Sequence, residues 1–256
     1  MSTLDHPKTA TLPPLVAGQR LDRATFHARY EVMPASTRAE LIGGIVHVPS
    51  PLSNDHAEGN VAPVVWLDHY VEFTPGLRLA INPSTFLDDE SEPQPDVTAR
   101  IPAELGGQSR IEAGYIAGAP ELVIEIARSS RRIDLGPKKA DYERAGVLEY
   151  VVFELDPDRV HWFVRRGDRF EPLRPGPDGL YRAEVFPGLW LDPVALFAGD
   201  RARLRAVVDR GLATPEHAAF VARLEAARRH RAENGEDRTA ENAERKTEND
   251  SANDRE

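Results

Sequence analysis

The sequence contains no cysteine, which excludes disulfide bonds and thiolate metal sites. It has no run of about 18 apolar residues, so we expect no membrane-spanning helix. Residues 1–19 lack the basic-then-apolar layout of a signal peptide, and we therefore expect a cytoplasmic protein. The sequence has fewer basic than acidic residues, with 32 Lys and Arg and 42 Asp and Glu, which gives a net charge of -10. That balance argues against strong non-specific binding to polyanions.

The chain of 256 residues has room for one large domain with appendages. Residues 1–20 are rich in Thr, Pro and Gly without periodicity, which predicts a flexible arm. Residues 21–200 carry the strand and helix patterns of the main domain. Residues 201–231 are predicted to form a helical extension. Residues 232–256 are polar and mixed in charge, which is typical of a disordered tail.

One stretch, Pro120–Phe153, is central to the prediction of the fold. An apolar strand over Leu122–Ala127 leads into a helix over Pro137–Ala145, and a second strand follows over Tyr150–Phe153. A strand–helix–strand unit packs well when the helix covers the sheet that both strands join. We therefore predict an α/β protein with a central mixed β-sheet flanked by helices.

The rest of the main domain is predicted to contain two helices, two hairpins and several short strands. The helices are expected over residues 23–33, capped by Asp22, and 55–73, capped by Ser53 or Asn54. The hairpins are expected over residues 39–48, around Gly43-Gly44, and over 160–173. Further strands are expected over 77–81, 85–87, 95–99, 181–185 and 189–191. Residues 101–119 show no clear period, so we predict a loop with a possible helix there.

Glu125 is unusual because it lies in the middle of the most apolar strand. A carboxylate in such a strand is costly unless a cation or hydrogen bonds compensate it. Alternation places Val123, Glu125 and Ala127 on one face of the strand. A compensating group is therefore expected on that face.

Asp96 follows Pro95 at the start of another predicted strand. If the strands of Asp96 and Glu125 are neighbours, the two carboxylates can converge at one end of the sheet. Carboxylates with open water positions suit Mg²⁺ or Mn²⁺. Such a metal activates water for attack on a phosphodiester, and a nearby lysine can stabilise the transition state.

Simpler interpretations exist for these residues when each is taken alone. Asp96 could cap the start of a strand, and Glu40 could be a surface residue of its hairpin. Lys138 and Lys139 together are typical of a solvated helix face. Tyr142 is expected to pack in the core.

The order of these residues resembles the Uma-two family of putative restriction endonucleases, in the PD-(D/E)XK nuclease superfamily. The matching residues are Glu40, Pro95-Asp96 and Glu125, then Asp134-x3-Lys138-x3-Tyr142-x3-Gly146-Val147-x-Glu149-Tyr150. The resemblance spans residues 23–200. It implies that Asp96 and Glu125 are metal ligands and that Glu40 and Lys138 join them as catalytic residues. His56 also has a match in the family, near a helix start.

Two positions depart from the superfamily pattern. Many members place the lysine two residues after the glutamate, where this chain has Ala127, so Lys138 from the following helix would replace it. Family members also tend to carry an acidic residue in the turn after Glu40, where this chain has Gly43-Gly44.

From the residues and the resemblance together, we expect a Mg²⁺- or Mn²⁺-dependent endonuclease that hydrolyses DNA and could form a homodimer. The main alternative is a binding or assembly protein that keeps the fold without efficient catalysis, which the acidic composition and Ala127 favour. A hydrolase that acts on another phosphorylated substrate is a further alternative.

Overall fold

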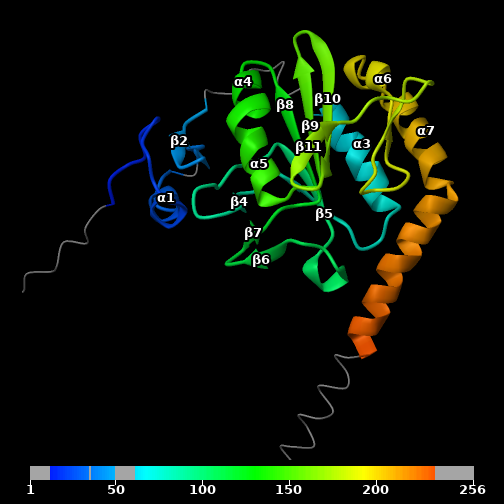
Figure 1. The fold of residues 1–256 in the computed structure, drawn as a ribbon, viewed down its shortest axis with the longest axis horizontal. Helices are drawn as coiled ribbons and strands as arrows, with labels where there is room; N and C mark the ends of the chain where they lie inside the picture. The colour runs from blue at the N-terminus through cyan, green and yellow to red at the C-terminus, as the bar shows by residue number, and fades with distance from the viewer. Residues whose placement is uncertain (1–11, 35, 50–60, 234–256) are drawn as a thin grey trace, which may run out of the picture.

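The centre of the molecule is a six-stranded mixed sheet in the order β11-β10-β9-β8-β5-β3 (Figure 1). The computed structural model describes residues 12–34, 36–49 and 61–233. β8 and β9 are parallel, and the other neighbours in the sheet are antiparallel. The predicted central mixed sheet is confirmed. Its strands are β3 (Arg78–Ile81), β5 (Val97–Arg100), β8 (Leu122–Ala127), β9 (Glu149–Leu155), β10 (Asp158–Arg166) and β11 (Arg169–Pro172).

Helices cover both faces of this sheet (Figure 1). The larger core lies on the face covered by α3 (Val61–Glu72), α6 (Pro193–Phe197) and α7 (Arg201–Leu212). A further helix over residues 215–233 adds Phe220 and Leu224 to the same core. The segment predicted as a helical extension therefore contributes apolar side chains to the main core.

The two faces of β8 follow the predicted alternation. Leu122, Ile124 and Ile126 belong to the larger core, and Val123 and Ala127 belong to the smaller core on the opposite face. The smaller core is covered by α5 (Lys139–Ala145), whose Tyr142 is fully buried in it. Glu125 shares the face of Val123 and Ala127, so its carboxylate lies on the α5 side of the sheet.

The predicted start of the covering helix is wrong. The helical segment begins with α4 (Arg131–Ile133), continues through η2 (Asp134–Lys138) and ends with α5. Gly136 has non-helical angles (φ -114, ψ -106), and Pro137 follows it inside η2. Proline is common at the first position of a helix, so the sequence gives no signal for the turns before Pro137. They are important because they place Asp134 and Lys138 in buried positions.

The N-terminal elements agree with the prediction. α1 (Arg23–Tyr30) begins at Asp22, whose Oδ1 accepts a hydrogen bond from the Thr25 backbone N–H at 2.8 Å. β1 (Glu40–Ile42) and β2 (Ile45–His47) form a hairpin. Gly43 and Gly44 both have positive φ angles (54 and 75), as the tight turn requires. The predicted cap at Ser53 or Asn54 lies outside the described residues.

Residues 101–119 do not form the predicted loop. They contain η1 (Ala103–Leu105), β6 (Arg110–Glu112) and β7 (Tyr115–Ala117), and β7 joins β4 (Thr85–Phe86) in a three-stranded sheet. The β6–β7 turn places Ala113 and Gly114 at positive φ (50 and 91). The usual signal for such a turn is Asn, Asp or Gly before the glycine, and the alanine hides it. Near the C-terminus, β12 (Tyr181–Arg182) pairs with β13 (Trp190–Leu191).

In the part of the chain that the structure describes, we find no helix that is both long and apolar enough to cross a membrane.

Candidate active site

The end of the sheet formed by β3, β5 and β8 brings Asp96 and Glu125 together. β5 runs antiparallel to β8 with Val97 opposite Ile124, so Asp96 and Glu125 are the next residues outward on the two strands. Asp96 Oδ2 accepts a hydrogen bond from the Ile126 backbone N–H at 2.7 Å. The two carboxylates therefore converge at one sheet edge, as the sequence had indicated.

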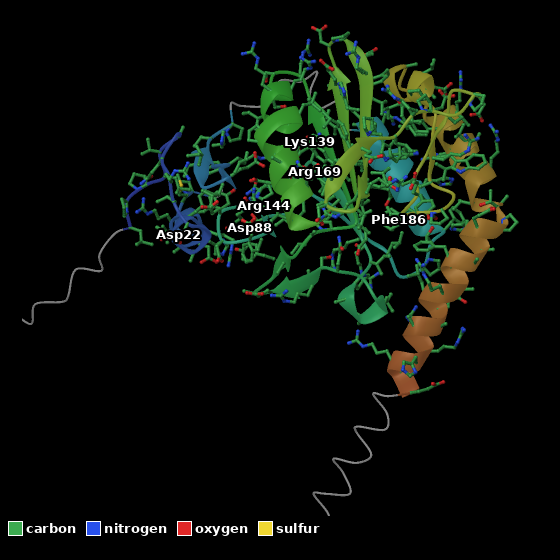
Figure 2. All side chains as sticks on the ribbon, viewed as in Figure 1. Asp22, Asp88, Lys139, Arg144, Arg169 and Phe186 are labelled. Atoms are coloured by element: carbon green, nitrogen blue, oxygen red, sulfur yellow. The ribbon has the colours of Figure 1, made fainter. Side chains whose placement is uncertain are left out.

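Lys138 provides the cation that the mid-strand Glu125 needs. Its Nζ lies 3.0 Å from Glu125 Oε1, 2.8 Å from Glu40 Oε1 and 3.9 Å from Asp134 Oδ1. The side chain is only 6% exposed, so the interpretation of Lys138 as part of a solvated face is wrong. Lys139 faces elsewhere, with its ammonium 4.3 Å from the ring centre of Phe163 (Figure 2).

Glu40 is held in place from its own hairpin and from the loop before β5. Its Oε1 accepts a hydrogen bond from the Gln94 backbone N–H at 2.7 Å. The Gln94 side chain in turn donates to the Tyr30 hydroxyl at 2.6 Å and to Ser84 Oγ at 3.2 Å. These contacts orient the carboxylate of Glu40 toward Lys138.

Asp141 attaches the hairpin to α5. Its Oδ2 accepts hydrogen bonds from the Gly43 backbone N–H at 2.7 Å and from Ser91 Oγ at 2.6 Å. Its Oδ1 pairs with Arg144 at 2.9 Å, and Arg144 Nε also donates to Asp88 Oδ2 at 3.0 Å (Figure 2). The β1–β2 turn and the helix that carries Lys138 are thus fixed relative to each other.

Tyr142 is a site residue that the sequence interpretation placed only in the core. Its hydroxyl donates a hydrogen bond to Glu125 Oε1 at 2.8 Å, while its ring is buried between apolar neighbours. The spacing of Asp134, Lys138 and Tyr142, four residues apart each time, is the signal that could have identified it. Residues four apart share one face of a helical segment.

The site holds an excess of negative charge. Burial raises the pKa of Glu125 well above its ordinary value, and the neighbouring carboxylates of Asp96, Asp134 and Glu40 raise it further, against the opposing effect of Lys138. Burial likewise raises the pKa of Asp134 to about 6. Burial alone would lower the pKa of Lys138, but the surrounding carboxylates outweigh it and raise that pKa above 10.5. Lys138 is therefore a cation held among the carboxyl groups of Glu40, Glu125 and Asp134.

These groups line a cavity of about 480 Å³. His47 also lines it, and burial lowers the pKa of its imidazole. Arg38 and Arg128, whose side chains are exposed, line it as well. His56, which matched the family near a helix start, lies outside the described residues.

The carboxylates of the site fit a Mg²⁺-type cation whose remaining ligands come from the substrate and from water. In the described segments, no three Asp, Glu or His side chains are grouped so that they alone could hold a metal ion. Mg²⁺ is commonly bound by one or two carboxylates together with substrate phosphates and waters. Asp96 and Glu125 provide two such carboxylates facing one cavity, and the charge excess would favour an added cation.

A protein-family model described as "Uma2: Putative restriction endonuclease" matches residues 24–194. The chain belongs to the Uma2 family. The resemblance inferred from Glu40, Asp96, Glu125 and Lys138 is thereby confirmed at the level of the family. A comparison with curated proteins gave no match.

The Uma2 fold is also found in a solved structure, described as a putative nuclease belonging to DUF820 from Anabaena variabilis. The match has a TM-score of 0.51 at 18% sequence identity and covers 67% of this chain and 96% of that chain. At this identity the likeness concerns the fold. The family description supports a nuclease-like protein, and restriction-endonuclease-like families generally use divalent metals.

Asp134→Asn should stabilise the metal-free protein more at pH 7 than at pH 4. The folded-state pKa of Asp134, about 6, exceeds its ordinary 3.8, so the native state holds this proton more strongly than the unfolded chain. Its ionisation therefore costs stability as the pH rises from about 4 to 6. The pKa difference corresponds to roughly 2–3 kcal/mol.

Urea unfolding of both proteins at the two pH values measures this difference. Asp168→Asn is the control, because the Asp168 side chain is 99% exposed. Equal stability differences for Asp134→Asn at pH 4 and pH 7 would contradict the raised pKa.

Proposed function

We propose that this Uma2 protein hydrolyses phosphodiester bonds in DNA with the help of Mg²⁺ or Mn²⁺. The observation that carries the proposal is the meeting of Asp96, Glu125 and Lys138 at one end of the sheet, in one cavity. Two carboxylates beside a buried lysine are the groups that suit metal-assisted attack on a phosphodiester. Family membership supports the same chemistry.

Asp96 and Glu125 would hold the metal ion. When bound, the metal would lower the pKa of a water molecule and offset the charge of the phosphodiester. Asp96 is oriented by the Ile126 N–H, and Glu125 by the hydroxyl of Tyr142 and the ammonium of Lys138. Both carboxylates are therefore preorganised by the protein.

Lys138 would act as a hydrogen-bond donor and as a fixed charge. The carboxylates of Glu125, Glu40 and Asp134 raise the pKa of Lys138 against the effect of burial, which favours its protonated form. Its ammonium would stabilise negative charge on the phosphoryl oxygens in the transition state. Glu40 would position this ammonium through their 2.8 Å ion pair.

One observation favours a non-catalytic alternative. The Lys138 ammonium lies between Glu40 and Glu125, so in the metal-free protein it compensates the charge that a metal would otherwise compensate. With Ala127 at the more usual lysine position, a protein that binds without cleaving remains the second candidate. The expected homodimer stays a prediction.

The direct test is cleavage of plasmid and single-stranded DNA by the purified protein with Mg²⁺ or Mn²⁺. We expect the wild type to cut at least one substrate, EDTA to stop the reaction, and Asp96→Asn to be inactive. Preparations of Asp96→Asn that cut as fast as wild type would show a contaminating nuclease. Absence of cleavage by a protein that binds the metal would favour the non-catalytic candidate.

A further inference from the structure

Two exposed arginines, Arg38 and Arg128, line the site cavity. Arg38 lies just before β1, and its Nη1 donates to Asn82 Oδ1 at 3.3 Å, which holds its guanidinium beside the end of β3. Arg128 comes directly after the last residue of β8. Both side chains are exposed, whereas Glu125 and Asp134 in the same cavity are buried.

The two arginines reach the cavity from the two strands that flank β5. Asn82, the hydrogen-bond partner of Arg38, follows the last residue of β3, and Arg128 follows the last residue of β8. β5 lies between β3 and β8 in the sheet, and Asp96, the residue before β5, lines the same cavity.

The negative charge of the cavity explains why cations at its edge would be needed for a polyanion to bind. The cavity floor carries the carboxyl groups of Glu40, Asp96, Glu125 and Asp134, and the whole chain has a net charge of -10. A polyanion approaching this floor is repelled unless cations at the opening contact its phosphates.

A third arginine near the end of β8, Arg131, is not part of the cavity lining. Its Nε lies 2.6 Å from Glu154 Oε1, and the same buried carboxylate contacts His161 through Oε2 at 2.7 Å. Arg131 does not line the cavity, whereas Arg38 and Arg128 do.

We infer that Arg38 and Arg128 bind backbone phosphates of a nucleic-acid strand that lies over the site cavity. This inference rests on the proposed function and adds the residues that position the substrate. The strand lies across the ends of β3, β5 and β8, and the arginines contact the sugar–phosphate backbone without reading its bases.

The test is the salt dependence of DNA binding, measured by fluorescence anisotropy of labelled single-stranded and duplex oligonucleotides in EDTA, so that no cleavage occurs. Removing one cation that binds a phosphate should reduce the slope of log K against log salt by about 0.7 for single strands or 0.9 for duplex. Arg38→Gln and Arg128→Gln should each show this reduction, and the double variant should show the sum. Arg38→Lys and Arg128→Lys should keep the wild-type slope.

Arg205→Gln is the matched control, because Arg205 is exposed on α7, which covers the α3 side of the sheet away from the cavity. Slopes unchanged in both cavity variants, or an equal reduction in Arg205→Gln, would overturn the inference. So would a wild type that binds neither oligonucleotide.

Separate assays of cleavage and Mn²⁺ binding distinguish this inference from the proposed function. Arginine-dependent binding without cleavage by any form would support the inference and count against the nuclease. Cleavage by a wild type whose binding is indifferent to both arginines would support the nuclease and overturn the inference.

Discussion

Lys138→Ala is expected to lower DNA cleavage by about 10²-fold or more, on the scale of losing one preorganised charge at the reacting group. It should also destabilise the metal-free protein by about 3–5 kcal/mol, because it leaves buried carboxylates without their cation. Glu40 and Glu125 both contact this ammonium, and the side chain is only 6% exposed. Metal affinity should be kept or increased, since the carboxylates then lack their internal counter-charge.

Lys139→Ala is the control for this prediction. Lys139 lies on the same helical segment, but its ammonium contacts the ring of Phe163, and within the described part of the chain it pairs with none of the four carboxyl groups of the site. Its loss should cost about 1 kcal/mol or less and leave cleavage intact. Cleavage by Lys138→Ala at the wild-type rate, under conditions where the variant is folded, would refute the role of the lysine.

Glu125→Gln is expected to abolish metal-dependent cleavage while leaving the metal-free protein as stable as wild type or more stable. The amide oxygen can still accept the hydrogen bonds from Lys138 and Tyr142 that Oε1 accepts now. The substitution removes an ionisable group from a buried cluster in which burial, and then the carboxylates of Asp96, Asp134 and Glu40, raise the pKa of Glu125. Urea unfolding and cleavage assays on the same preparation measure both effects.

Glu121→Gln is a control that we expect to destabilise the protein, in contrast to Glu125→Gln. Glu121 is also buried, but it accepts backbone hydrogen bonds with both oxygens, from Ile101 and from Gln108. In the glutamine variant, the side-chain NH₂ group would face a backbone N–H, so that two donors meet. We expect this to lower the free energy of unfolding by about 1–3 kcal/mol. Cleavage should persist. A loss of several kcal/mol in metal-free Glu125→Gln would instead make Glu125 a structural ion-pair partner.

The parts of the fold that were predictable are those fixed by local periodicity. Alternation along β8 assigned its residues to two faces and placed Glu125 on the face of α5, where Lys138 is found. The Gly43-Gly44 pair identified the β1–β2 hairpin, because few other residues adopt its positive φ angles.

The parts that were not predictable depend on tertiary contacts or on an atypical turn. The neighbouring positions of Asp96 and Glu125 follow from the order β8-β5, which no local pattern encodes. Pro137 concealed the preceding helical turns, and with them the burial of Lys138 and the hydrogen bond from Tyr142 to Glu125. Ala113 concealed the β6–β7 hairpin.

The central claim is that Asp96 and Glu125 hold a divalent cation, and calorimetric titration of Mn²⁺ into the purified protein tests it without any DNA substrate. We expect Mn²⁺ to bind to the wild type and to Lys138→Ala, and we expect binding to be lost in Asp96→Asn and Glu125→Gln. Glu121→Gln should bind as the wild type does. Mn²⁺ binding that persists unchanged in both Asp96→Asn and Glu125→Gln would contradict the account.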